Sequence, residues 1–227
     1  EVSFNTLNWL IENDFYLPSD TTFYEYLPMD TLRALTAVRR GLITSLYPQG
    51  TGTTPEKQEL MTRSADGVRL LHDIGCYHGA GTDGRLPGLL QGHAGFFDDA
   101  DDIEFVGYWR SAPYAQFRPQ DPKAPPPYMS IYRNRKSDRA LVVVANASAQ
   151  PIQGTLWLNR GLLLPNRLLA GNQGLWLMDI ESGKYLGGNY DNRGEWYDRF
   201  QWNDKEKRYE TDWFTLPAYN HRLLVLR

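Results

Sequence analysis

Five prolines between residues 119 and 127 divide this chain into two parts of different character. Proline has no backbone N–H and a fixed φ, so a proline-rich stretch neither continues a helix nor joins the interior of a sheet. We therefore expect an extended linker over residues 119–127. Residues 1–118 mix helical and strand patterns, whereas residues 128–227 show strand patterns almost throughout.

Short apolar runs alternate with turn-forming residues after the linker. Residues 140–146 form a continuous apolar run rich in β-branched side chains, which predicts a central strand buried on both faces. Turns are predicted at residues 134–138 and 181–184. The predicted strands cover residues 128–132, 140–146, 155–158, 175–180, 196–202, 209–216 and 222–226. This spacing predicts an all-β domain, a C-terminal antiparallel β-sandwich.

Helices and strands alternate before the linker. Residues 30–41 predict a helix that Asp30 caps and Gly41 ends, and residues 55–66 predict a second helix. The predicted strands cover residues 42–47, 68–75 and 102–109. Such alternation is typical of β/α units. A complete eight-fold barrel needs roughly 250 residues. We therefore expect either a smaller α/β domain or the final units of a TIM-like (β/α) barrel that begins elsewhere.

Three stretches carry a resemblance to a known family: residues 33–36 continuing to 41–50, residues 104–110, and residues 129–133 followed by 141–146. In this order they resemble the C-terminal half of the bacterial β-N-acetylgalactosaminidase family of glycoside hydrolases and its uncharacterised relatives. The resemblance implies a barrel that carries an adjacent Asp-Glu pair, with the acetamido group of the substrate as nucleophile. No adjacent Asp-Glu pair occurs in this chain. We therefore expect the main catalytic carboxylates to lie outside it and assign no catalytic residue.

Two groups of residues are candidates for contact with a carbohydrate. Asp73, at the end of a predicted barrel strand, is followed by Tyr77 and His78, and a carboxylate there can bind sugar hydroxyls or act as an acid or base. Its alternative role is to cap a turn beside a buried His72. Tyr108, Trp109 and Arg110 follow the predicted last barrel strand. A Trp there can stack on a pyranose ring or pack between the barrel and the β domain.

The function hypothesis is the C-terminal portion of a glycoside hydrolase, whose barrel a second polypeptide or self-association completes. The first residues, 1–4, resemble the interior of a longer sequence and favour this hypothesis. The alternative is a non-catalytic carbohydrate-binding or assembly protein. A degenerate homologue that kept the fold and lost the chemistry is a third possibility.

Composition limits the partners. The formal net charge of −3 argues against a nucleic-acid-binding surface. The single cysteine, Cys76, excludes an intrachain disulfide and a Cys-based zinc site, and we expect no metal or cofactor. No apolar run approaches the roughly 20 residues that a membrane-spanning helix requires. The compartment stays open, and we favour a secreted or periplasmic one.

Overall fold

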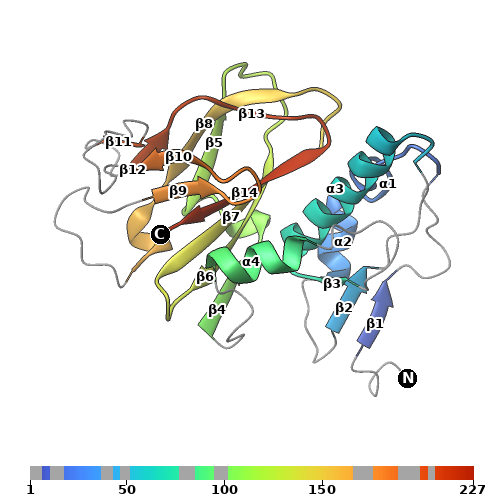
Figure 1. The fold of residues 1–227 in the computed structure, drawn as a ribbon, viewed down its shortest axis with the longest axis horizontal. Coiled ribbons are helices and arrows are strands. Elements are labelled where there is room, and N and C mark those ends of the chain that lie inside the picture. Colours follow the sequence, from blue (N-terminus) through green and yellow to red (C-terminus); the bar gives the residue numbers. More distant parts are fainter. Residues whose placement is uncertain are drawn as a thin grey trace.

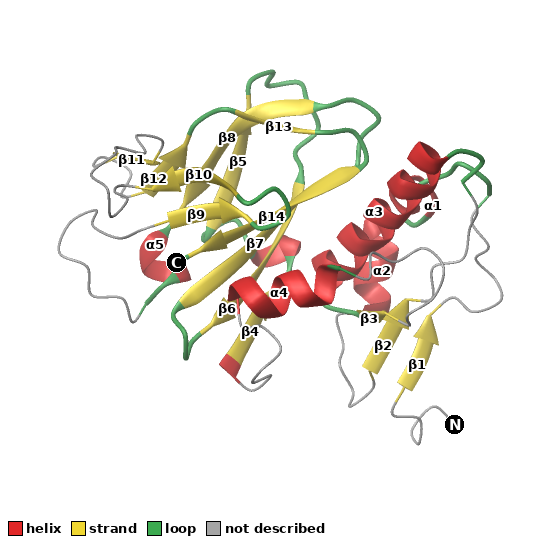
Figure 2. Ribbon diagram, in the orientation of Figure 1, coloured by secondary structure: helices red, strands yellow, loops and turns green. Residues whose placement is uncertain are grey.

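The computed structural model describes residues 7–10, 18–36, 43–46, 52–76, 85–94, 102–165, 176–188, 200–203 and 208–227. A six-stranded antiparallel sheet forms the middle layer of the molecule. Helices cover one face of this sheet and a second antiparallel sheet covers the other (Figures 1 and 2). A small parallel sheet lies beyond the helices, near the N-terminus (Figure 1).

The six-stranded sheet runs in the order β10-β9-β14-β7-β6-β4, and every neighbouring pair is antiparallel. Its strands are β4 (Ile103–Val106), β6 (Tyr128–Asn134), β7 (Arg139–Asn146), β9 (Trp176–Asp179), β10 (Lys184–Gly188) and β14 (Asn220–Leu226). Turns join β6 to β7 and β9 to β10 at the two places where the sequence predicts them.

Strand β7 is buried on both faces, as its apolar run predicts. Leu141, Val143 and Ala145 face the helices, and Val142 and Val144 face the second sheet. Successive side chains of a strand point to opposite faces. A continuous apolar run therefore supplies two cores at once, which is possible only for a strand in the middle of three layers.

The second sheet completes a β-sandwich, which confirms the predicted β-rich architecture. Its strands are β5 (Ala115–Pro119), β8 (Ile152–Leu158), β11 (Phe200–Asn203), β12 (Arg208–Thr211) and β13 (Phe214–Leu216). Strand β8 pairs with β5, β12 and β13, all antiparallel. The short helix α5 (Arg160–Leu163) follows β8. The proline-rich residues 120–127 connect β5 to β6. Strands β4 and β5 precede these residues in the chain but belong to the sandwich sheets, because β4 pairs with β6 and β5 pairs with β8.

The N-terminal part contains β1 (Leu7–Leu10), α1 (Phe23–Tyr26), α2 (Met29–Thr36), β2 (Ile43–Leu46), α3 (Pro55–His72), β3 (Gly75–Cys76) and α4 (Leu86–Ala94). Strands β1, β2 and β3 are parallel neighbours in chain order, with helices between them. This agrees with the expected alternation of helices and strands. No closed barrel forms within the residues that the structure describes.

The predicted strand over residues 68–75 is wrong: α3 continues to His72, and only Gly75–Cys76 is strand. The short run Val68–Leu71 suits a strand when read by itself. Met61, Ala65, Val68 and Leu71 are all buried. Their spacing of three and four residues is helical, so the run extends the buried stripe of α3.

The predicted last barrel strand over residues 102–109 is also wrong. Strand β4 ends at Val106 and pairs antiparallel with β6, at the edge of the six-stranded sheet. The 3₁₀ helix η3 (Tyr108–Arg110) follows it. A barrel strand would be parallel to its neighbours, so β4 belongs to the sandwich instead. The single strand predicted over 209–216 is two strands, β12 and β13.

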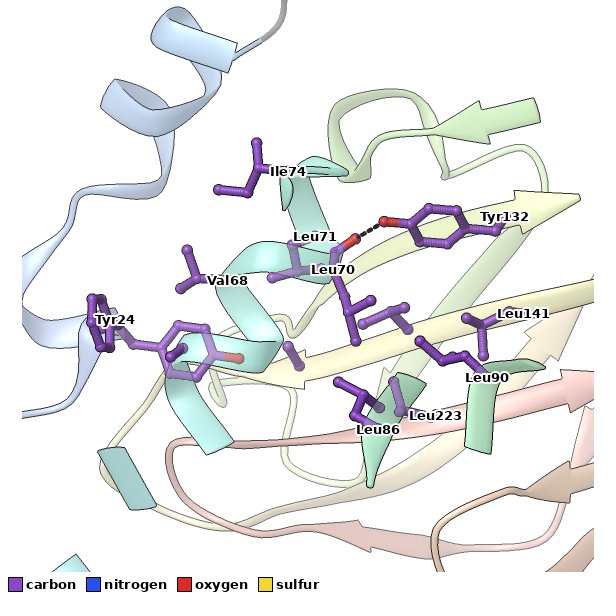
Figure 3. Close-up of a cluster of buried hydrophobic side chains, with 14 of the residues drawn as sticks. Tyr24, Val68, Leu70, Leu71, Ile74, Leu86, Leu90, Tyr132, Leu141 and Leu223 are labelled. Carbon is purple, nitrogen blue, oxygen red and sulfur yellow. Dashed lines mark hydrogen bonds between the residues drawn. The ribbon is translucent and has the colours of Figure 1, made fainter. Parts of the chain in front are cut away.

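A continuous apolar core fixes the helices to the sandwich (Figure 3). Helix α3 contributes Val68 and Leu71, and α4 contributes Leu86 and Leu90. The sheet contributes its own buried residues from β6, β7 and β14: Tyr132, Leu141, Val143, Ala145, Leu223 and Val225. Because one core contains buried residues from both the helices and the six-stranded sheet, the described helices and the sandwich form one packed body.

Candidate functional site

Aromatic rings gather where the end of α3 meets η3. We call this group the junction cluster: His72, Phe105, Tyr108, Trp109 and Tyr128. The centre of the Tyr108 ring lies 5.0 Å from that of Trp109, 5.0 Å from that of Tyr128 and 5.4 Å from that of His72, always edge-on. This is a favourable geometry for aromatic pairs. The structure thus brings Tyr108 and Trp109, two predicted sugar contacts, beside His72.

Strand β6 and helix α3 together fix the backbone of η3. The amide of Tyr108 donates a hydrogen bond to Ser130 Oγ (3.0 Å), and Ser130 Oγ donates to the carbonyl oxygen of Leu71 (2.7 Å). Gly107 lies directly against the Trp109 ring, so that a Cβ atom at this position would overlap the indole. The positions of Tyr108 and Trp109 therefore depend on Ser130 of the sheet and on Gly107.

The carbonyl oxygen of Met29 lies near two polar side chains of the cluster. It accepts a hydrogen bond from the Tyr108 hydroxyl (2.9 Å), and it lies 3.3 Å from His72 Nε2. His72 Nδ1 lies 2.8 Å from the carbonyl oxygen of Val68. Burial lowers the pKa of His72 and raises the pKa of Tyr108 to about 12. Because backbone carbonyl oxygens lie beside both ring nitrogens of His72 and beside the Tyr108 hydroxyl, these groups serve to hold the cluster in position.

Trp109 contacts both the helices and the sheet. The Arg33 guanidinium carbon lies 5.1 Å from the centre of its ring, within the range of a cation–π interaction. The Phe105 ring of β4 lies 6.2 Å away and edge-on, and the His72 ring lies 6.5 Å away. Trp109 is partly exposed. These contacts agree with its packing between layers, and its contact with a sugar stays a prediction.

The other predicted sugar contacts either follow a member of the cluster in the chain or lie outside the described residues. Asp73 has φ 54° and ψ 49°, and its backbone N–H bonds the Arg69 carbonyl, so it ends α3 on the amino side of β3. The expected position at the carboxyl end of a strand is therefore wrong. Arg110 is exposed at the end of η3. Tyr77 and His78 lie outside the described residues.

A buried ionic group, which the sequence did not indicate, joins α3 to the sheet. Arg63 forms two hydrogen bonds with the Glu181 carboxylate, and it donates to Asn220 Oδ1 (2.8 Å) and to the carbonyl oxygen of His221 (3.0 Å). Burial, with Arg63 nearby, holds the pKa of His221 well below its ordinary value. Arg63 lies 118 or more positions before each of these partners in the chain, so no local pattern could reveal the group. Its role is to hold α3 on the sheet.

A cleft of about 310 Å³ opens on the side of Tyr108 that faces the sandwich. Its walls come from η3 and the residues after it, from β5, and from the connection into β6. The lining residues are Tyr108, Ser111, Ala112, Ala115, Gln116, Phe117, Pro126, Pro127, Tyr128 and Met129. Sequence reasoning found only Tyr108 among them. The alternation of buried Ala115 and Phe117 could have indicated strand β5 itself, but not its position beside Tyr108.

The described residues contain no group of three or more His, Cys, Asp or Glu side chains that could hold a metal ion. Among the same residues, no helix is long and apolar enough to cross a membrane.

Comparison with known proteins does not assign a family. No protein-family model and no curated protein matches this chain. Among solved structures, a rhamnosidase from Novosphingobium sp. PP1Y matches with a TM-score of 0.29 and 13% sequence identity. The match covers 88% of this chain and 15% of the rhamnosidase. A likeness this weak supports no conclusion about fold or function.

Proposed function

We propose that this chain is the C-terminal portion of a glycoside hydrolase, in which the sandwich supports a β/α domain. Polypeptide outside this chain completes that domain. The main catalytic carboxylates lie on that other polypeptide. The role of this chain is to hold the β/α units in place and to contribute residues that position a carbohydrate.

The strand order of the parallel sheet carries this proposal. Strands β1, β2 and β3 are neighbours in chain order, and helices connect them. A β/α barrel adds its strands in this sequential way, whereas a doubly wound sheet reverses its order part-way. Within the described residues, β1 and β3 each pair only with β2. Open edges of this kind are normally covered by further strands or another element.

The shared core supports the role of the sandwich as a platform. On one face of the six-stranded sheet, the buried side chains are packed against α3 and α4. The Arg63–Glu181 pair adds a second connection, because both side chains are largely buried and pair with each other. A sheet face filled in this way serves to orient the helical layer and the parallel strands beyond it.

The substrate-positioning residues of the proposal are Tyr108, Trp109 and Arg110, with Tyr77 and His78, which follow β3 in the chain; Asp73, which ends α3 before β3, is not among them. In β/α barrels the active site lies at the carboxyl ends of the strands. Tyr77 and His78 directly follow β3 in the chain, which places them in the sequence where such contacts arise. Arg110 is the exposed member of the group, and its guanidinium can donate to sugar hydroxyls.

Hydrolysis of aryl glycosides by the native assembly and by this chain alone tests the proposal. We expect the assembly to be active and the chain alone to be inactive, because hydrolysis requires two carboxyl groups at a set separation. In the assembly, Arg110→Met should raise KM more than it lowers kcat, whereas Lys123→Met, an exposed residue of the proline-rich connection, should change neither. An assembly that hydrolyses no glycoside would contradict the proposal.

A further inference from the structure

The cleft beside Tyr108 has rigid aromatic walls. The rings of Tyr108 and Tyr128 stand 5.0 Å apart at 82°, and the largely buried Phe117 and Met129, 8% and 9% exposed, also line the cleft. Pro126 and Pro127 form the opposite wall. The Tyr108 ring is fixed because its hydroxyl is bonded to the Met29 carbonyl. A cleft whose walls are already fixed binds a ligand without the entropic cost of ordering them.

Polar groups at the cleft are few and neutral. Ser111 Oγ donates to the Tyr108 carbonyl (3.1 Å), and Gln116 Nε2 donates to the Ala112 carbonyl (3.1 Å). Within the described part of the chain, the Gln116 amide oxygen therefore remains an acceptor for a ligand, and the Tyr128 hydroxyl remains a donor and acceptor. No Asp, Glu, Lys or Arg is among the lining residues that the structure describes. A charged ligand would lose its hydration here without gaining a partner.

We propose that this cleft binds one or two rings of an uncharged saccharide. The apolar face of the sugar packs on Tyr128, and its hydroxyls bond the Gln116 amide oxygen and the Tyr128 hydroxyl. The cleft volume of about 310 Å³ lies at the small end of ligand sites, which suits a short saccharide. The inference names the sugar chemistry of the proposed carbohydrate function and rests on it.

The shape of the cleft favours a sugar over a proline-rich peptide. Peptides in the polyproline conformation dock along an extended groove lined by aromatic rings. Here the Tyr108 and Tyr128 rings are perpendicular to each other, so they form no parallel row of rings along the cleft. A second surface cleft, beside Trp176, contains Arg139, Arg227 and Asp138. The two clefts thus differ in charge, and the neutral one selects for a neutral ligand.

The test is to titrate the folded chain with methyl glycosides and disaccharides of neutral hexoses. Binding is measured by NMR chemical-shift changes and by calorimetry. Tyr128→Leu and Gln116→Ala should each weaken binding about ten-fold or more, the effect of losing one well-placed contact of about 1.4 kcal/mol. Gln153→Ala is the matched control, because Gln153 is an exposed glutamine on the neighbouring strand β8 that does not line this cleft. Thermal unfolding of each variant shows whether it is folded.

Three results would overturn the inference: no neutral saccharide binds at tens of millimolar, binding is unchanged in folded Tyr128→Leu and Gln116→Ala, or only glucuronate, sulfated sugars or a proline-rich peptide bind. These results are separable from the glycosidase proposal. Sugar binding in the cleft without hydrolysis by the native assembly removes the enzymatic role only. Hydrolysis by the assembly without binding in the cleft removes this inference only.

Discussion

The hydroxyl of Tyr132 on β6 donates a hydrogen bond to the main-chain carbonyl of Leu70 near the end of α3 (2.7 Å; Figure 3). Ser130, two residues earlier on the same face of β6, bonds the next carbonyl, that of Leu71 (2.7 Å). The last four carbonyls of a helix have no partner within it. The Tyr132 and Ser130 side chains therefore provide hydrogen-bond donors for two carbonyl oxygens at the end of α3. These two bonds determine where the helix meets the sandwich.

Removal of the Tyr132 hydroxyl should destabilise the protein while leaving its apolar packing intact. Tyr132→Phe leaves the buried Leu70 carbonyl without a partner, so we expect the free energy of unfolding to fall by about 1 to 2 kcal/mol in urea denaturation. Tyr128→Phe on the same strand is the control and should change it by less than about 0.5 kcal/mol. Equal effects of the two substitutions would contradict the capping role of Tyr132.

Truncation on either face of β7 should destabilise the whole molecule. Val142 and Val143 are both 0% exposed, one in the core between the sheets and the other in the core against the helices. Each change to Ala removes two buried methyl groups and should lower the free energy of unfolding by about 2 kcal/mol. Val143→Ala should also accelerate global hydrogen exchange in α3 and β7 equally. Faster exchange in α3 alone would mean that the helices unfold independently of the sandwich.

The sheet was easier to predict than the helices because its signals are local. The apolar run of β7 and the turns after β6 and β9 each lie within a few residues, and all three are where the sequence indicated. The end of α3 was not predictable in this way. Val68 to Leu71 suits strand and helix alike, and the choice depends on burial against β6 and β7, which are distant in the chain.

Stability should fall as the pH drops through the range where an ordinary histidine becomes charged. His221 is buried and its pKa is lowered, so it stays neutral in the folded protein, whereas in the unfolded chain it binds a proton below pH of about 6.5. The unfolded state then binds more protons, and stability is lost as the pH falls. From this residue we expect a loss of about 1 kcal/mol between pH 6.5 and 5.5.

The slope of the free energy of unfolding against pH shows whether His221 causes this loss, because the slope does not depend on how stable a variant is at any one pH. His221→Gln should flatten the curve between pH 6.5 and 5.5, and His72→Gln should flatten it in the same direction, since burial also lowers the pKa of His72. The carboxylates whose pKa is lowered, such as Glu104, act below this window. An unchanged slope in His221→Gln would contradict the assignment.

A glycine inside α3 makes room for a buried tyrosine. A Cβ atom at Gly67 would overlap the Tyr24 hydroxyl, and that hydroxyl has no hydrogen-bond partner in the part of the chain that the structure describes. Gly67→Ala, which stabilises an ordinary helix by about 1 kcal/mol, should here destabilise by about 1 to 3 kcal/mol. In a Tyr24→Phe background the loss should shrink by about 1 kcal/mol or more. Urea denaturation of the four proteins measures this, and additive effects would contradict it.

The candidate site was predictable only in part. The prediction of Tyr108 and Trp109 rests on their position after the predicted last barrel strand; that strand belongs to the sandwich, yet both rings lie in a cluster, and Tyr108 lines a cleft. The other walls of that cleft, Phe117 and Tyr128, come from different sheets of the sandwich. Their proximity depends on how the two sheets pack, which no local pattern in the sequence records.

The most direct test of the central claim is the mass of the native particle, with every polypeptide in it identified. The account predicts additional polypeptide, either as an extension of this chain or as a second chain, that contributes parallel strands beside β1 or β3 and carries the catalytic carboxylate pair. A native particle consisting of this 26.1 kDa chain alone, monomeric and folded, would contradict it.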